Sequence, residues 1–260
     1  MNIRLAVVAI AALPLYSCVH STYLQSPMHT NSNSYKAIPL HSEEVKSATY
    51  ASGMLTSGSS NSSLRDLNLG FIGSVHRSHN IGNFQGFYGA TGAVGNYHVD
   101  RDYFLGVYDS LFNRNGSNKF YSAWGFNGGI NYVLPLRNGG EWRVFGTAVS
   151  WTREFGDYLS FRRKIPDSVV NAVDRHRDFT TLAFHSEFVF RIRKKGSLGY
   201  KFGYVTSLTS LRDEQTPYFN TTPGYFSQTL HFTRNHITGF WQTNFGYYAI
   251  SSQLGVSYRF

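Results

Sequence analysis

The sequence predicts an all-β protein, an antiparallel up-and-down transmembrane β-barrel behind an N-terminal signal peptide. Three observations predict this fold: a C-terminal segment that alternates apolar and polar residues, several earlier segments with the same alternation, and a composition rich in aromatic residues and poor in proline. Because successive residues of a strand point to opposite faces, such alternation gives each strand one apolar and one polar face.

The first 17 residues have the layout of a secretory signal peptide. Arg4 provides a short basic region, an apolar stretch follows from Leu5 to Leu15, and the small residue Ser17 precedes the only cysteine, Cys18. The apolar stretch is too short to span a bilayer, which takes about 20 apolar residues. We therefore expect residues 1–17 to be removed from the mature protein.

Cys18 is the candidate lipidation site. Residues 15–18 (LYSC) resemble the lipobox of bacterial lipoproteins, in which the cysteine becomes the acylated first residue, although Tyr16 is bulkier than that motif usually holds. The resemblance implies an acyl anchor at a membrane, with Val19 compatible with sorting to the outer membrane. The alternative is an ordinary signal-peptidase site beside an incidental cysteine. A single cysteine excludes an intrachain disulfide.

Residues 18–42 are rich in Ser, Thr, Asn and His and predict a flexible tether, lipidated at its start. The barrel is predicted to fill residues 43–260. Its strand candidates are 44–56, 64–76, 84–99, 119–134, 141–152, 179–193, 197–209 and 247–260. The clearest alternation places Leu198, Tyr200, Phe202, Tyr204 and Leu208 opposite Ser197, Gly199, Lys201, Gly203 and Ser207.

The lengths of the links give an independent test of this assignment. If the N-terminus is anchored on the periplasmic side, the links 77–83, 135–140 and 194–196 are periplasmic, and all three are short. The alternate links 100–118, 153–178 and 210–224 are long, as outer loops are in such barrels, whereas the link 57–63 is short. With both chain ends periplasmic the count is even. Eight strands are the first choice and ten the second, with an extra hairpin between 225 and 246.

The C-terminal segment 249–260 carries a barrel-assembly signal. Val256, Tyr258 and the terminal Phe260 fall on one face of the predicted strand, with Ser257 and Arg259 on the other. We expect the barrel-assembly machinery to recognise this segment.

Composition and charge agree with an exported membrane barrel. Aromatic residues make up 17% of the chain while the mean hydropathy is −0.28, as expected where apolar and polar faces alternate. The net charge of +9 could suggest nucleic acid, but the basic residues are scattered or lie in loops, so anionic lipid headgroups are the simpler partner.

One predicted outer loop contains a helix signal and a basic cluster. Pro166, Asp167 and Ser168 followed by a valine stripe that ends at Val173 predict a short helix, either docking on a partner or packed at the barrel mouth. Before it, Arg162, Arg163 and Lys164 are a candidate site for lipopolysaccharide phosphates or an acidic ligand. The alternative is a solvated run of charges.

Catalytic and metal-binding motifs are absent from the sequence, so we predict no metal, no cofactor and no enzyme activity. The one constellation to weigh is His185 and Glu187, which share the lumen face of a strand. A carboxylate could orient the imidazole as a base for a lipid hydrolase. The alternative is a polar lumen network with Arg143, Arg191 and Lys201, because buried charges in a narrow barrel need partners.

The layout resembles a group of uncharacterised outer-membrane β-barrel lipoproteins from Bacteroidetes-like bacteria. The residues that carry it are Cys18, the polar segment after it, Ile38-Pro39-Leu40 before Glu43-Glu44, and residues 253–257 (QLGVS). The resemblance implies fold and outer-membrane location and brings no active site.

Four functions remain open. The leading one is a lipid-anchored structural or binding barrel whose outer loops (100–118, 153–178, 210–246) engage an unknown external ligand or partner. A small pore or transport component needs ten or more strands, since eight strands fill their own interior. A lipid-modifying hydrolase using His185 is the third. A tethered soluble lipocalin-like barrel is the fourth.

Overall fold

The structure is a computed structural model of the 260-residue chain. It describes residues 23–43, 45–60, 66–100, 118–137, 139–166, 172–193, 196–212, 220–246 and 249–260. The predicted signal peptide and Cys18 lie outside these ranges.

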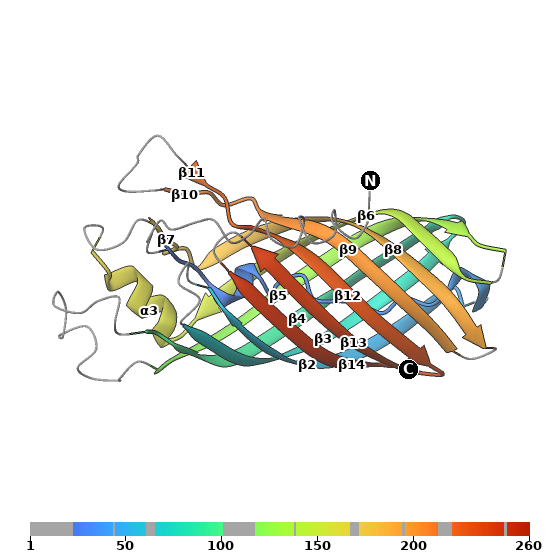
Figure 1. The fold of residues 1–260 in the computed structure, drawn as a ribbon, viewed down its shortest axis with the longest axis horizontal. Coiled ribbons are helices and arrows are strands. Elements are labelled where there is room, and N and C mark those ends of the chain that lie inside the picture. The colour runs from blue at the N-terminus through green and yellow to red at the C-terminus, as the bar shows by residue number, and fades with distance from the viewer. Residues whose placement is uncertain are drawn as a thin grey trace, which may run out of the picture.

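Ten antiparallel strands close into one barrel (Figure 1). In chain order they are β2 (Ser47–Ser59), β3 (Leu67–Ile81), β4 (Phe84–His98), β5 (Asn118–Pro135), β6 (Glu141–Phe155), β8 (Asp178–Arg193), β9 (Gly196–Ser207), β12 (Gly224–Arg234), β13 (Ile237–Gly246) and β14 (Ile250–Arg259). Each strand pairs with the next in sequence, and β14 closes the barrel on β2. The predicted fold class is therefore confirmed.

The first-choice count of eight strands is wrong, and the second choice of ten is confirmed. The extra pair is the hairpin β12–β13, whose two-residue turn contains Asn235 with a positive φ of 55°. Asparagine tolerates this left-handed conformation better than most residues. The hairpin belongs to the wall because His231 and Gln242 point into the lumen, while Leu230 and Trp241 point outward.

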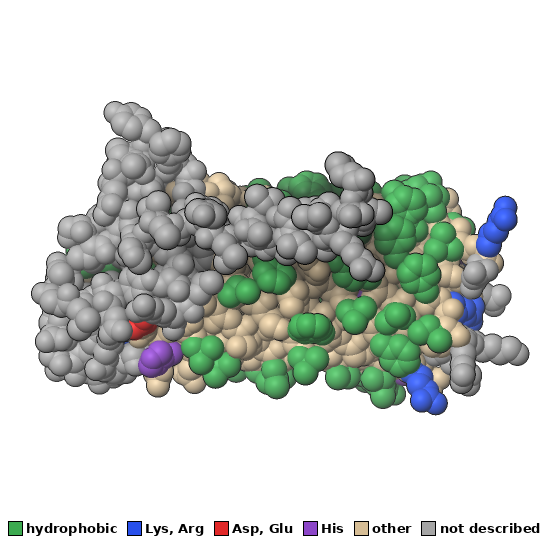
Figure 2. Space-filling model, in the orientation of Figure 1, with side chains coloured by type: hydrophobic (Ala, Val, Ile, Leu, Met, Phe, Trp, Pro, Cys, Tyr) green, Lys and Arg blue, Asp and Glu red, His purple; other side chains and the backbone are tan. Residues whose placement is uncertain are grey.

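The outer wall is apolar and the lumen is polar, the reverse of a lipocalin-like barrel. Outward side chains that are at least one-third exposed include Leu55, Val75, Phe126, Val149, Phe184, Tyr204, Trp241 and Leu254. Buried polar residues of the same strands include Thr56, Ser74, Gln85, Asn127, Ser150, Thr181, Gln242 and Gln253. Figure 2 shows apolar side chains spread over the wall between the two ends, with Lys and Arg side chains at one end.

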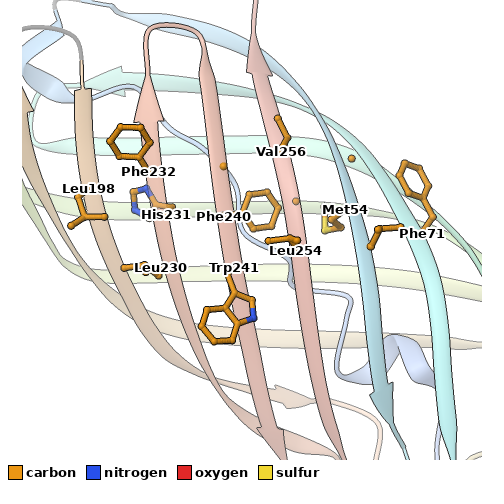
Figure 3. Close-up of a pocket in the computed structure, with 14 residues that line it drawn as sticks. Met54, Phe71, Leu198, Leu230, His231, Phe232, Phe240, Trp241, Leu254 and Val256 are labelled. Atoms are coloured by element: carbon orange, nitrogen blue, oxygen red, sulfur yellow. The ribbon is translucent and has the colours of Figure 1, made fainter.

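Aromatic side chains gather near both ends of the wall. Trp124 packs against Trp151 with ring centroids 5.1 Å apart, close to the long loops. At the opposite end Phe84 packs against Tyr132 at 5.4 Å, beside the short turn that follows β3. Two such belts are typical of the interfaces of a membrane-spanning barrel. Between the belts, a shallow groove crosses the wall at β12, β13, β14 and β2 (Figure 3).

The links between strands separate into a short-turn end and a long-loop end of the barrel (Figure 1). Links 82–83, 136–140, 194–195 and 235–236 lie at the short-turn end. Links 99–117, 156–177 and 208–223 lie at the other end, with the shorter links 60–66 and 247–249. Because β12 and β13 are wall strands, the predicted outer loop 210–246 shrinks to the link 208–223.

The long-loop end contains small elements of its own. They are helix α3 (Asp157–Lys164), and strands β7 (Ala172–Val173), β10 (Leu211–Arg212) and β11 (Asn220–Thr221). This helix ends before Pro166, where the predicted helix starts, and Val173 at the end of the predicted helix belongs to a strand. Residues 167–171, on which most of the predicted helix falls, lie outside the described residues. No helix in the described part of the chain is long and apolar enough to cross a membrane.

The largest departure from expectation concerns the segment before β2. In place of a flexible tether, residues 23–43 run through the barrel lumen and include β1 (Tyr23–Leu24) and two 3-10 turns, Pro27–His29 and His41–Glu43. Between Tyr23 and Leu40, every residue except Asn33 and Ile38 is buried. A polar composition fits a solvated tether, and it fits a segment inside a lumen lined by polar side chains equally well. Composition alone therefore does not distinguish the two.

Candidate functional site: the occupied lumen

The N-terminal segment enters at the long-loop end and leaves at the short-turn end. Tyr23 and Leu24 pair in parallel with Ala172 and Val173 of β7. About twenty residues later, the ring nitrogen Nε2 of His41 lies 2.8 Å from the carbonyl oxygen of Gly82, in the turn between β3 and β4. We refer to residues 23–43 as the plug, because they occupy the lumen over this distance.

Side chains of the wall hold the middle of the plug. Gln242 Oε1 accepts a hydrogen bond from the backbone N–H of Tyr35 at 2.9 Å. Lys36 Nζ donates to Ser74 Oγ at 3.1 Å. Asn31 Oδ1 accepts from both Thr56 and Gln253, at 3.0 and 2.8 Å. The plug therefore satisfies polar groups that a ten-stranded lumen would otherwise leave to water.

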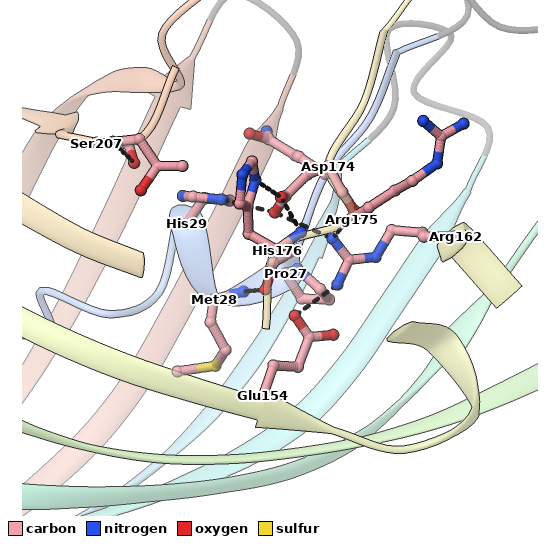
Figure 4. Close-up of polar contacts among 12 residues, drawn as sticks. Pro27, Met28, His29, Glu154, Arg162, Asp174, Arg175, His176 and Ser207 are labelled. Atoms are coloured by element: carbon pink, nitrogen blue, oxygen red, sulfur yellow. Dashed lines mark hydrogen bonds and ion pairs between the residues drawn. The ribbon is translucent and has the colours of Figure 1, made fainter. Parts of the chain in front are cut away.

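A buried ionic cluster ties the plug to the loop between β6 and β8 (Figure 4). His29 Nε2 lies 2.8 Å from Asp174 Oδ2. Arg162 of α3 bridges Asp174 and Glu154, at 3.1 and 2.6 Å. All four side chains are almost fully buried. We call these four residues, with His176, the latch.

Charges within the latch shift the titration of its loop residues. Burial alone would raise the pKa of Asp174, but hydrogen bonds from His176 and His29, and the charge of Arg162, hold that pKa well below its ordinary value. The hydrogen bond to Asp174 raises the pKa of His176. Burial opposes the charge of Arg162, yet the carboxylates of Glu154 and Asp174 raise its pKa. The latch is thus a compact set of paired charges.

The latch changes the interpretation of the basic cluster predicted at residues 162–164. Arg162 is fully buried and paired, so it is not presented to an external ligand. Arg163 and Lys164 are exposed, and Arg163 Nε donates to the carbonyl oxygen of Arg175 at 3.1 Å. Among the described residues between β6 and β8, the exposed basic side chains are therefore Arg163, Lys164, His176 and Arg177.

A second ionic cluster lies in the lumen closer to the short-turn end. Arg143 Nη2 lies 2.6 Å from Glu141, and Arg143 Nη1 lies 2.9 Å from Glu187. The same guanidinium donates to the plug carbonyl of Ile38 at 3.2 Å. His231 Nε2 lies 2.8 Å from Glu187 Oε1, close enough for an ion pair but not aligned as a hydrogen bond.

The structure does not bring His185 and Glu187 together as a catalytic pair. His185 Nε2 lies 2.7 Å from Asn131 Oδ1, whereas Glu187 contacts Arg143 and His231. The hydroxyl of Ser186 lies on the outer face, where it accepts from Trp142 Nε1 at 3.0 Å. This arrangement matches the alternative of a polar lumen network.

That network includes Arg143 and Lys201 but not Arg191. Lys201 pairs in register with Glu187 across β8 and β9. Arg191 is exposed at the short-turn rim. At the same rim, Arg259 of β14 pairs with Glu43 at the end of the plug.

The predicted assembly signal occupies the end of β14. Val256, Tyr258 and Phe260 are 54%, 47% and 75% exposed on the outer wall. Tyr258 and Phe260 contact each other edge to face at 5.2 Å.

Sequence reasoning missed most of the site. The plug residues His29, Tyr35 and Lys36, and the latch residues Glu154 and Asp174, carried no motif. One available signal was the spacing of Met28, Tyr35 and Leu40 through the polar segment, since a solvated tether has no need of buried apolar side chains.

Comparisons with known proteins found structural neighbours only. No family model matches the chain, and no curated protein matches it. An outer-membrane channel from Pseudomonas putida F1 aligns over 87% of this chain and 98% of its own, with 10% identity and a TM-score of 0.44. The transport unit of the autotransporter AIDA-I from Escherichia coli covers 89% and 96%, with 9% identity and a TM-score of 0.41. Neisserial surface protein A covers 82% and 97%, with 11% identity and a TM-score of 0.35.

The class of the protein follows from its own architecture. A closed antiparallel barrel with an apolar outer wall, aromatic belts, a polar lumen and short turns at one end defines an outer-membrane β-barrel. Within that class, its distinguishing feature is a lumen occupied by its own N-terminal segment.

Proposed function

We propose that this protein is a non-enzymatic outer-membrane barrel that is closed at rest by its plug and engages an external partner through its long-loop end. The observation that carries the proposal is the burial of the plug along the lumen from Tyr23 to Leu40. A lumen filled by protein provides a scaffold rather than a standing aqueous path.

The organisation of the long-loop end supports a binding role. Helix α3 is fixed by the latch, and β7 pairs with β1 of the plug, so this end is a supported surface. The surface carries Arg163, Lys164, His176 and Arg177 as exposed basic side chains. An anionic partner, such as the phosphates of a surface glycolipid, fits this charge.

We further propose that Cys18 is acylated and that its acyl chains insert at the long-loop end. Five residues span at most about 18 Å in an extended chain, and Tyr23 pairs with Ala172 at that end. In this proposal the anchor lies on the outer side of the membrane, opposite to the periplasmic anchor expected from the sequence. Labelled fatty acid retained by the wild-type protein and lost in Cys18→Ser would support acylation.

A gated pore or transport component is the second candidate. The observation that favours it is the way the plug is held: beside the apolar packing of Met28 and Tyr35, it contacts β2, β3, β13 and β14 through side-chain hydrogen bonds, which can exchange with water. Removing the plug would leave a ten-stranded lumen wide enough for an extended peptide.

Planar-bilayer recording separates the two functions. A closed barrel gives no conductance for the wild type and a steady conductance for a variant without residues 23–40. Voltage-dependent openings of the wild type would favour the gated pore. Steady wild-type conductance equal to that of the deletion variant would contradict the proposal of a closed barrel.

A further inference from the structure

The outer wall contains an apolar groove that lies apart from the latch and the long-loop end. Its volume is about 560 Å³, and its lining is drawn from six strands (Figure 3). The outward-facing lining residues are Gly53, Leu55, Phe71, Leu198, Leu230, Phe232, Gly239, Trp241, Leu254 and Val256.

Two outward-facing glycines in one row of residues, Gly239 and Gly53, lower the wall on either side of Val256. Gly239 pairs in register with Val256, Val256 pairs with Gly53, and Gly53 pairs with Gly73. A side chain built at Gly239 would meet no other atom within 4 Å. The wall is therefore low at the two glycines, while Val256 between them and the apolar residues around them form the banks of the groove.

The next row of residues toward the long-loop end forms the upper bank. Trp241, Leu254 and Leu55 pair in register there, and each is more than half exposed. Phe71 closes one end of the groove, because its ring lies 3.2 Å from the position that a Gly53 side chain would take. The other end opens between β12 and β9, at Phe232 and Leu198.

The open end of the groove lies next to a cationic side chain. Arg234 is exposed on the same face of β12 as Phe232, two residues further toward the short-turn rim. Among the described residues, no carboxylate pairs with it. Its guanidinium thus stands between the apolar groove and the rim, where the phosphate of a membrane lipid would lie.

The length of the groove fits one acyl chain. From Leu198 on β9 to Gly53 on β2 there are four strand spacings, or roughly 19 Å at about 4.8 Å each. One leaflet contributes about 15 Å to the hydrocarbon core. Because strands tilt by about 35–45° in such barrels, the groove crosses the leaflet diagonally and can follow an acyl chain through roughly 11–13 Å of that depth.

We propose that this groove binds one glycerophospholipid of the leaflet at the short-turn end, with an acyl chain in the groove over Gly239 and the phosphate against Arg234. The site is independent of the plug and of any partner at the long-loop end.

Quenching of Trp241 tests this proposal. The purified protein is reconstituted in phosphatidylcholine bilayers with increasing amounts of a phosphatidylglycerol that carries bromine on one acyl chain. The chain has four tryptophans, and Trp241 alone lines the groove. The fluorescence of Trp241 is obtained by subtracting the fluorescence of the Trp241→Phe variant from that of the wild type. We expect half-maximal quenching of Trp241 at a several-fold lower fraction of brominated lipid than for the other three tryptophans.

Two variants and a control locate the effect. Gly239→Leu adds an apolar side chain to the groove at a position where a Cβ atom has no neighbour within 4 Å. This variant should bring Trp241 quenching to the level of the others, whereas Arg234→Gln should reduce the preference for the anionic lipid. Gly86→Leu is the control, since a side chain there meets only the carbonyl oxygen of Gly129 at 3.8 Å, away from the groove. A gel-mobility shift on boiling verifies folding, and Gly239→Ala replaces the leucine variant if that variant does not fold.

The proposal is overturned if Trp241 is quenched no earlier than the other tryptophans, or if filling the groove leaves the preference unchanged. It is also overturned if Trp241 is protected from the quencher while the protein migrates as a dimer, because a second copy would then cover the groove.

Discussion

His29 of the plug and Asp174 of the β6–β8 link lie 2.8 Å apart, Nε2 to Oδ2, with both side chains shielded from solvent. This contact joins the segment inside the lumen to the loop outside it. Arg162 of α3 also pairs with Asp174. The same carboxylate therefore holds both α3 and the end of the plug that lies at the long-loop end.

The first prediction concerns this carboxylate. Asp174→Asn leaves Arg162 with one anionic partner and should destabilise the barrel by about 3–5 kcal/mol, the usual cost of breaking a buried ion pair. The temperature at which mobility on a detergent gel shifts to the unfolded position measures the loss. Asp178→Asn is the matched control: its pair with Arg153 is more than one-third exposed and screened by solvent, so little or no change in the shift temperature is expected. Equal losses in the two variants would contradict the account of the latch.

The second prediction is a dependence of the latch on pH. The hydrogen bond to Asp174 raises the pKa of His176, so this contact stabilises the fold fully below the ordinary histidine pKa of about 6.5. The stabilisation is lost as the pH rises through the higher pKa of the folded state. The lowered pKa of Asp174 acts in the opposite direction: its stabilisation is present above the ordinary value of 3.8 and is lost as the pH falls below that value toward the lower pKa of the folded state.

The gel-shift temperature should therefore fall as the pH rises above about 6.5, and His176→Ala should flatten this part of the profile. A slope that persists in the His176→Ala variant would assign the effect to another group.

The third prediction addresses the lower ionic cluster. Arg143→Met removes the cation that Glu141 and Glu187 share and also a donor to the plug carbonyl of Ile38. We expect a loss of about 3–5 kcal/mol in unfolding free energy, because two carboxylates stay buried without their partner. Arg137→Ala, at an exposed turn position, should change the unfolding free energy by less than about 0.5 kcal/mol. Urea unfolding in lipid vesicles compares the two variants.

The fourth prediction tests the membrane-facing wall. Val149 is 46% exposed near the middle of β6. Val149→Arg should cost about 2–4 kcal/mol in a bilayer, as charges do at the midplane of membrane barrels. Val149→Leu should fold like the wild type. If Val149→Arg refolds into vesicles as well as Val149→Leu, this face does not contact the hydrocarbon core.

The strand pattern could be predicted from the sequence because one rule determines it. On β9, Leu198, Tyr200 and Tyr204 are exposed outward and Ser197 and Ser207 are buried, as the alternation predicts. The β12–β13 hairpin was only the second choice because Thr229–Trp241 could also form part of a long outer loop. In this hairpin, His231 and Gln242 fall on the inner face of the alternating pattern. Polar residues on that face are typical of wall strands around a polar lumen.

The site could not be predicted to the same extent, because its contacts are distant in sequence. His29 and Asp174 are 145 residues apart, and no local pattern links them. The polar character of residues 20–42 fits water and a polar lumen equally well. His185 and Glu187 share a face as predicted, yet their partners come from other strands, and those partners determine what each side chain can do.

The occupied lumen is tested most directly by cross-linking residues 31 and 56. Asn31 of the plug and Thr56 of β2 are in side-chain contact at 3.0 Å, and Ser52 and Ser257 provide a wall-to-wall contact of 2.9 Å. Each pair is replaced by cysteines in a separate variant that also carries Cys18→Ser. Both variants are refolded in lipid vesicles and oxidised. The account predicts that Asn31→Cys/Thr56→Cys forms a disulfide as completely as Ser52→Cys/Ser257→Cys. A disulfide between residues 52 and 257, with none between residues 31 and 56, would show a folded barrel without its plug and would contradict the account.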